Sequence, residues 1–231
     1  EAMERVLARV TSPIVSQFYQ TIHKEEGVDI RLNSGLIKFE KSDSGLIAHI
    51  DNGEKIHLDS AIVGIGVIPN IELAEEAGLS CDNGIVVNQF TQTDDPAIFA
   101  IGDCSNHHNI IYDRQIRLES VPNAMEQAKV SAATICGQGQ AYNQLPWFWS
   151  DQYDVKLQTA GLFQGYDQVV IRGDQSTRKF SVFYLKLGVL IAVDALNSPA
   201  EFMLSKKLII NNVSPEITQL ANPEVSLKIF L

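Results

Sequence analysis

A short apolar strand that runs into Gly-Asp constrains this chain more than any other feature. Residues 98–101 are apolar on both faces, as expected for a strand inside a covered parallel sheet, and Gly102-Asp103 follows them directly. An open α/β sheet binds ligands at the carboxyl ends of its strands. Gly102 would let a ligand approach the backbone, and the Asp103 carboxylate would accept a hydrogen bond from a sugar or polyol hydroxyl. The structural alternative is a strand that simply ends in a Gly-Asp turn.

The residues before and after this strand carry further helix and strand signals. Ser12 can cap a helix that Gly27 ends. The period then changes to that of strands, with turn signals at Asp43-Ser44-Gly45 and Asp51-Asn52-Gly53, which predicts a small antiparallel meander. The elements expected before residue 138 are strands at 28–32, 46–50, 60–66 and 85–87, and helices at 12–27, 71–77 and 121–136.

Beyond a boundary near residues 138–146 the pattern becomes strands at hairpin spacing. The expected strands cover 156–161, 168–173, 179–185 and 189–196, and a helix follows at 199–210. This order predicts an α+β unit with an antiparallel sheet, placed after an α/β part.

The charge distribution bears on the class of partner. The formal net charge is -10; residues 1–146 hold 10 basic and 20 acidic residues, while residues 147–231 hold 8 of each. An acidic chain without a basic stripe is a poor nucleic-acid binder, so we expect no nucleic acid as partner. No apolar run approaches the roughly 18 residues of a membrane span, so we expect no membrane partner either.

Cysteine and histidine spacing gives no metal signal. Cys81, Cys104 and Cys136 lie far apart, which favours reduced thiols in a cytoplasmic protein. The adjacent His107 and His108 would point apart on a strand and have no cysteine or carboxylate at ligand spacing, so we expect a solvated loop there and no metal site.

Four strings of residues resemble one class of flavoprotein. Thr93 to Asp103, as Thr-x5-Phe-Ala-x-Gly-Asp, is similar to the second flavin motif of flavoproteins with two dinucleotide-binding domains, in which the aspartate binds the ribityl chain of FAD. Residues 63–70 resemble the glycine-rich return from the NAD domain to the FAD domain, and residues 117–128 resemble the segment that meets the flavin ring. Residues 146–154 resemble the NAD(P)H-dependent ferredoxin reductases that serve oxygenases, of the putidaredoxin-reductase kind.

This resemblance implies cofactors, partners and sites. The cofactors are FAD and NAD(P)H, and the partner is an iron–sulfur protein, a ferredoxin or a rubredoxin. Hydride would pass from the nicotinamide to FAD, and two single electrons from FAD to the partner. Trp147 and Trp149 share a face if their segment is extended, and the resemblance places Trp149 at the flavin edge where the partner docks. The cofactor-binding residues implied are Gly66, Gly102, Asp103, Glu119, Ser120, Val121, Trp149 and Glu1.

The chain departs from this family at its glycine motifs. Neither Gly-x-Gly-x-x-Gly unit is present, and Pro69 stands where a third glycine would follow Gly64 and Gly66. We therefore expect an incomplete two-dinucleotide-binding-domain α/β flavoprotein with Rossmann-like remnants. Its domains would be the C-terminal parts of the NAD(P)H domain (1–69) and of the FAD domain (70–145), then the reductase C-terminal domain (146–231).

The absence of both glycine motifs affects the cofactor binding and the assembly that we expect of this chain. Without the first glycine loop, which holds a pyrophosphate, the chain alone would be inactive and colourless. Glu1 falls where the family has the acidic residue that holds the adenosine ribose, and the alternative for Glu1 is a frayed terminus. The exposed strand edges of a truncated sheet would favour a homodimer.

Two other hypotheses compete with the hypothesis that the chain is part of a reductase. Disulfide reductases supply a His-Glu pair from their C-terminal domain, and this chain has no histidine after His108. The second hypothesis is that the chain is the C-terminal assembly module of a flavoprotein similar to apoptosis-inducing factor. That family shares the Phe148-Trp149-Ser150-Asp151 string. Basic patches or long insertions would favour that module, and the sequence has neither.

Overall fold

The computed structural model describes residues 1–43 and 45–231. The chain divides into two compact units, residues 1–67 and 68–231. None of the helices in the described part of the chain is both long and apolar enough to cross a membrane.

The first unit begins with the helix α1 (Pro13–Glu25), which confirms the predicted helix at this place. Ser12 is its N-cap residue and Pro13 occupies its first turn. Gly27 follows with φ +84°, a left-handed conformation that glycine adopts without steric cost, and it ends the helix as predicted. The buried face of α1 comprises Val15, Ser16, Phe18, Tyr19 and Ile22.

The predicted meander is the antiparallel sheet β1-β2-β3 of this unit. The Gly53 N–H donates to the Ile50 carbonyl at 2.9 Å, so the second turn lies where its signal predicts it. The first turn signal includes Ser44, which lies outside the described residues. The strands are β1 (Leu36–Ser42), β2 (Gly45–Ile50) and β3 (Lys55–Leu58).

Two predicted strands of the first unit are wrong. Residues 28–32 make only scattered backbone bonds, one from the Glu1 amino group to the Arg31 carbonyl at 3.0 Å, instead of a ladder. Residues 60–66 are irregular and exposed, with Ile62 100% and Ile65 85% accessible. A strand that is apolar on both faces forms only where neighbours pair with it and cover it. The described residues of this unit provide no such neighbours.

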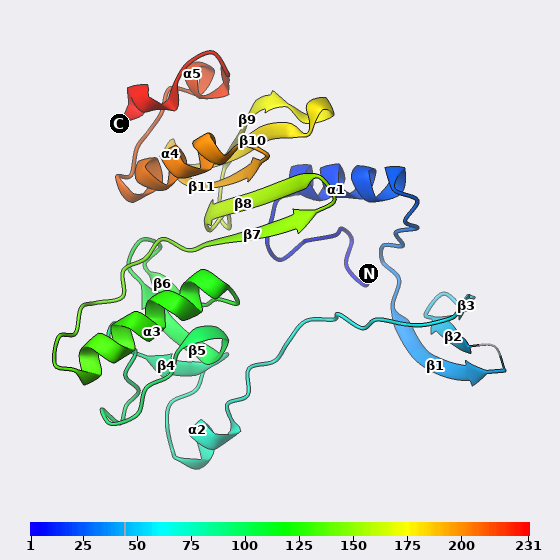
Figure 1. The fold of residues 1–231 in the computed structure, drawn as a ribbon, viewed down its shortest axis with the longest axis horizontal. Coiled ribbons are helices and arrows are strands. Elements are labelled where there is room, and N and C mark those ends of the chain that lie inside the picture. Colours follow the sequence, from blue (N-terminus) through cyan, green and yellow to red (C-terminus); the bar gives the residue numbers. More distant parts are fainter. Residues whose placement is uncertain (44) are drawn as a thin grey trace. The chain divides into compact units, whose positions relative to one another are not determined.

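The second unit opens with a small mixed sheet of order β4-β5-β6, with β4 parallel to β5 and β5 antiparallel to β6. Its helix α3 packs against β5 (Figure 1), and the short helix α2 and strand β4 lie where they were predicted. The elements are α2 (Glu72–Glu76), β4 (Ile85–Val87), β5 (Ser105–Asn109), β6 (Arg114–Arg117) and α3 (Val121–Ile135).

The strand predicted at residues 98–101 is also wrong. Only Phe99 pairs, as an isolated bridge with Gln92, while Ile98 and Ile101 are each 38% exposed. The ladder forms just after the Gly-Asp turn instead, in β5, whose polar sequence Ser-Asn-His-His-Asn has no strand signal. Both histidines of the predicted solvated loop lie in that strand, so the loop is wrong; His107 is buried, and only His108 is exposed to solvent as expected.

The C-terminal part is a five-stranded antiparallel sheet of order β7-β8-β11-β10-β9, followed by helices. This confirms the predicted α+β unit and its four hairpin strands. The elements are β7 (Trp147–Gln152), β8 (Val155–Gly161), β9 (Gln168–Asp174), β10 (Lys179–Lys186), β11 (Val189–Leu196), α4 (Pro199–Ile210) and α5 (Ile217–Ala221).

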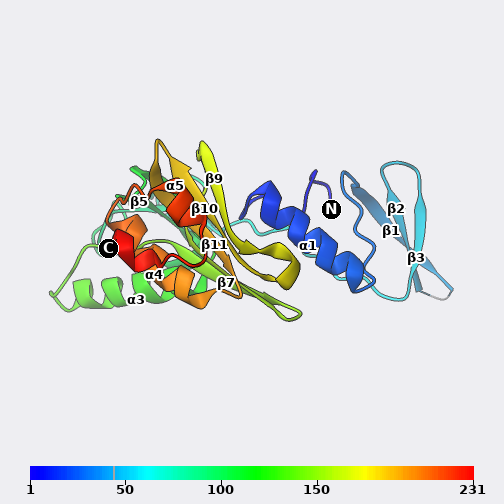
Figure 2. The same cartoon turned by 90° about the horizontal axis from the view of Figure 1, so that it is seen from above.

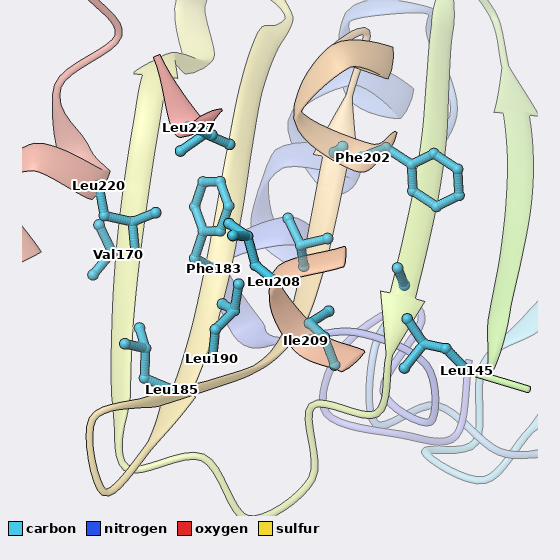
Figure 3. Packing of buried hydrophobic residues seen from close by; sticks show 13 residues of the cluster. Leu145, Val170, Phe183, Leu185, Leu190, Phe202, Leu208, Ile209, Leu220 and Leu227 are labelled. Atoms are coloured by element: carbon cyan, nitrogen blue, oxygen red, sulfur yellow. The ribbon is translucent and has the colours of Figure 1, made fainter. Parts of the chain in front are cut away.

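The core of this part lies between the sheet and its C-terminal helices. Figure 2 shows α4 and α5 on one side of β9, β10 and β11. Figure 3 shows Phe183 of β10 among Leu208 of α4, Leu220 of α5 and Leu227 near the C-terminus. Burying each such side chain contributes about 1.5–3 kcal/mol, so this cluster holds the helices to the sheet.

Candidate functional site

The Gly102-Asp103 turn is a single 3-10 turn (Gly102–Cys104) beside the helix α3. Gly102 is buried and has φ +74°, which disfavours every residue with a side chain. A Cβ at this position would lie 3.5 Å from Cβ of Ala124, so the turn and the helix approach closely through two small residues. The role of Gly102 in bringing the backbone close to a ligand stays a prediction, because the close approach seen here is to the helix.

Gln127, on the buried face of α3, holds this turn. Its Oε1 accepts hydrogen bonds from the Gly102 N–H at 2.7 Å and from the Ser105 hydroxyl at 2.9 Å. The Ser105 hydroxyl also lies 3.0 Å from the Gly102 carbonyl. The sequence places Gln127 within the string 117–128 but does not predict this contact. The available signal was a polar glutamine one turn after Asn123, on the same face of a helix that is otherwise rich in alanine.

Three more buried polar side chains continue the network behind Gln127. Asn123 Nδ2 lies 3.3 Å from Gln127 Oε1, and Asn123 Oδ1 accepts from the Tyr142 hydroxyl at 2.8 Å. Gln127 Nε2 lies 3.2 Å from His107 Nδ1, and the His107 ring meets the Tyr142 ring edge-on at 5.0 Å between centroids. Burial, together with the neighbouring His108, lowers the pKa of His107 to about 4, so this imidazole is neutral near pH 7. Burial also raises the pKa of the Tyr142 hydroxyl.

Arg117, at the end of β6, links Asp103 to Glu119. Its Nη1 donates to the backbone carbonyl of Asp103 at 2.9 Å, and its Nη2 forms an ion pair with Glu119 Oε1 at 2.8 Å. The Asp103 side chain is exposed, and so is Glu119. Two of the predicted cofactor-binding residues therefore lie on either side of one arginine, and the Asp103 carboxylate faces solvent.

Ser120 and Val121 form the start of α3. Ser120 is the N-cap and its hydroxyl oxygen accepts from the Asn123 N–H at 3.3 Å, so it satisfies a helix N-terminus as well as standing near the turn. Val121 is 57% exposed, which leaves its apolar side chain available to a ligand.

Trp149 lies on β7, the edge strand of the five-stranded sheet, and is 44% exposed. Its ring is 5.7 Å from that of Trp147, so the two share a face as predicted. Trp147 packs on Phe202 at 5.6 Å, and the Lys206 ammonium lies 4.9 Å over the Trp147 ring. Trp147 is thus anchored in the fold, whereas Trp149 is accessible.

Gly66 and Glu1 belong to the other compact unit. Gly66 has φ +100°, and a Cβ there would lie 3.0 Å from Nη1 of Arg9. The Glu1 carboxylate accepts from the Met3 N–H at 2.8 Å and is exposed. The structure brings Gly102, Asp103, Glu119 and Ser120 together around α3, whereas Gly66 and Glu1 lie in the unit of residues 1–67.

Comparison with known proteins gives the family. A family model described as pyridine nucleotide-disulphide oxidoreductase matches residues 1–128, and a second, described as reductase C-terminal, matches residues 147–231. The chain belongs to the pyridine nucleotide-disulphide oxidoreductase family. This confirms the resemblance seen in the sequence strings and the predicted fold class.

The similarity to individual proteins supports the same family assignment. Putidaredoxin reductase CamA of Pseudomonas putida is 47% identical over 227 residues, which are 97% of this chain and 54% of the relative. Rhodocoxin reductase of Rhodococcus erythropolis is 40% identical over 99% of this chain and 54% of the relative. The reductase in the covalent putidaredoxin reductase–putidaredoxin complex matches with a TM-score of 0.94 and 45% identity, over 100% of this chain and 56% of that one. The chain thus spans about half the length of the relatives it matches.

Proposed function

We propose that this chain is part of an FAD-dependent oxidoreductase that passes electrons from NAD(P)H to a ferredoxin or rubredoxin serving an oxygenase. The observation that carries the proposal is the Gly102-Asp103 turn, which is pinned to α3 and presents a carboxylate to solvent. The relatives reported above are a putidaredoxin reductase and a rhodocoxin reductase, which favours this function over a disulfide reductase or an assembly module.

The residues at the turn fit an FAD. The Asp103 carboxylate is an exposed acceptor that ribityl hydroxyls can reach, and Gly102 lets the turn before it pack closely on Ala124 of α3. Glu119, Ser120 and the exposed Val121 would line the same region at the start of α3. When bound, FAD supplies the conversion between a two-electron hydride donor and single-electron transfer. The chain's own contribution is to hold and orient that group.

The first unit would contribute to the NAD(P)H site in this proposal. Glu1 would accept hydrogen bonds from the adenosine ribose, and Gly66 would lie on the return toward the FAD domain. Division into the parts 1–69, 70–145 and 146–231 belongs to the same proposal, supported by a compact unit that ends at Val67 and by a family match that begins at Trp147. A cytoplasmic location also belongs to it, supported by the free thiols of Cys81, Cys104 and Cys136.

The exposed face of Trp149 would meet the iron–sulfur partner. Its accessibility on an edge strand and its contact with the anchored Trp147 support this assignment. A solved relative is a reductase joined to its putidaredoxin, which supports a small electron-transfer protein as the partner.

The direct experiment uses the intact reductase that carries this sequence. In the Asp103→Ala variant we expect the dissociation constant of FAD to rise by roughly one to two orders of magnitude, because a charge-assisted hydrogen bond contributes about 1.5–3 kcal/mol. Flavin fluorescence titration of the apoprotein measures this constant. Asp113→Ala, which removes another exposed carboxylate of the same unit, is the control. Equal FAD affinity in the two variants would refute the assignment of the turn.

A further inference from the structure

We propose that Gln127 is a positioning residue for FAD: it fixes the Gly102-Asp103 turn so that the Asp103 carboxylate meets the ribityl chain, and His107 fixes the orientation of its amide. This inference rests on the proposed FAD-binding function of the turn. Gln127 would not itself contact the cofactor.

The geometry of Oε1 is the first argument. This single oxygen gathers donors from three elements: the Gly102 N–H of the turn at 2.7 Å, the Ser105 hydroxyl of β5 at 2.9 Å and Asn123 Nδ2 of α3 at 3.3 Å. Gln127 is fully buried, and the Ser105 side chain is buried with it. The turn, the strand and the helix therefore meet at one acceptor.

The conformational freedom of the turn is the second argument. Glycine at φ +74° has few steric restraints of its own, so its backbone needs a partner to stay in one conformation. A buried N–H left without an acceptor is costly, which makes the bond from Gly102 to Gln127 the natural restraint. In the part of the chain that the structure describes, no side-chain bond holds the Asp103 carboxylate. Its position follows from the backbone, which Gln127 and Arg117 hold.

The orientation of the amide is the third argument. A carbonyl oxygen only accepts and an amide nitrogen only donates, so three donors on one side require Oε1 there and place Nε2 toward His107. Nδ1 of His107, 3.2 Å away, is then the acceptor, which assigns the ring proton of the neutral imidazole to Nε2, a buried nitrogen without a hydrogen-bond partner among the described residues. The reversed amide would set NH2 against the Gly102 N–H. Because His107 is buried and rests edge-on against Tyr142, it keeps the amide from reversing.

A double-mutant cycle in the intact reductase tests this positioning role. The variants are Gln127→Met, Asp103→Ala and the combination of the two; methionine keeps the volume and removes both polar atoms. Tyr184→Phe is the matched control, because it removes a buried hydroxyl that donates to Asp194 at 2.6 Å in the C-terminal sheet. For each variant, the dissociation constant of FAD, the thermal midpoint of the apoprotein and the visible circular dichroism of bound flavin are measured.

We expect Gln127→Met to weaken FAD binding about tenfold, equivalent to about 1.4 kcal/mol, and to alter the flavin dichroism. Tyr184→Phe should lower the thermal midpoint without changing either flavin property. In the Asp103→Ala background, the effect of Gln127→Met should shrink to less than about threefold, because both residues act through one carboxylate. If Gln127→Met does not fold, Ser105→Ala, which removes one donor from the same oxygen, enters the cycle with an expected loss of about twofold to fivefold.

The outcomes separate the two proposals. If Asp103→Ala binds FAD normally, the proposed function of the turn fails. If Asp103→Ala weakens FAD but Gln127→Met weakens it no more than Tyr184→Phe, Gln127 is only structural and the inference is overturned. Full additivity of the two substitutions also overturns it, because Gln127 would then act on FAD by a route that bypasses Asp103.

Discussion

Arg117 donates from Nη1 to the backbone carbonyl of Asp103 at 2.9 Å, across 14 residues of chain. The same guanidinium pairs with Glu119 at 2.8 Å, and its side chain is only 11% exposed. The fixed fork of arginine is suited to two such acceptors at once. One largely buried cation thus braces the candidate flavin turn at Asp103, next to the residue that Gln127 holds.

On the proposed function of the turn, replacing Arg117 should weaken FAD binding in the intact protein that carries this sequence. For Arg117→Met we expect roughly a threefold to thirtyfold rise in the dissociation constant, since a hydrogen bond from a charged group contributes about 1.5–3 kcal/mol and only part of that loss reaches the cofactor. Fluorescence titration of the apoprotein gives the constant. Arg114→Met, an exposed arginine on the same strand, serves as the control. Identical affinities for the two variants would contradict the bracing role.

Trp149→Ala should separate the two half-reactions. Hydride transfer from NADH should stay nearly intact, while reduction of the iron–sulfur partner slows, because Trp149 lies on the exposed edge strand and not in the anchored core. Stopped-flow absorbance follows both steps. Added salt should slow only partner reduction, since exposed charges are screened within about 8 Å at physiological ionic strength.

A control for Trp149 is Leu187→Ala, which removes another exposed apolar side chain, in the turn between β10 and β11. Loss of FAD or of folded protein in Trp149→Ala would show that this tryptophan is a core anchor. Unchanged rates in both half-reactions would show that the partner docks elsewhere.

Arg172 should be essential for ordering the C-terminal segment. It is buried on β9 and donates to four backbone carbonyls of that segment: Leu220, Asn222, Pro223 and Val225. Arg172→Met leaves these acceptors unpaired, and we expect a loss on the order of 3–5 kcal/mol in the free energy of unfolding. Arg172→Lys should recover only a small part, because one ammonium reaches fewer acceptors than the fork.

Hydrogen exchange checks this expectation locally. In Arg172→Met the amides of residues 217–230 should exchange faster than in the unmodified protein, whereas Lys179→Met, an exposed cation on β10, should leave them unchanged. Normal protection of residues 217–230 in Arg172→Met would mean that the apolar contacts alone hold them.

His107 should make the protein less stable in acid. Its folded-state pKa of about 4 lies below the ordinary 6.5, so the unfolded chain takes up the proton first. The stability linked to neutral His107 is complete above about pH 6.5 and is lost as the pH falls toward 4, to a total of about 3 kcal/mol. Urea unfolding at about pH 7.5 and about pH 4.5 measures the change. His107→Gln, which does not titrate, should show a smaller drop between the two, and an equal drop would rule out this histidine as the cause.

Local sequence patterns were enough to predict the helices and strands whose signals lie within one short segment. The strand 189–196 and the helix 199–210 were predicted at their exact bounds, because hairpin spacing, a proline at the helix start and apolar periodicity are all properties of short segments. The family strings likewise located Gly102, Asp103, Glu119, Ser120 and Val121, the predicted cofactor-binding residues at the turn and around the start of α3.

Only the tertiary structure determined the strands and contacts that depend on residues far apart in the sequence. The segments 60–66 and 98–101 are as apolar as buried strands, yet an apolar pattern states only that a segment can be buried, and the pairing partner decides whether it is a strand. β5 is a strand despite its polar sequence because β4 and β6 pair with it on either side. The contacts of Gln127 with Gly102 and with His107 span 25 and 20 residues. No periodicity within a segment encodes such contacts, since they exist only after helix and strand have packed.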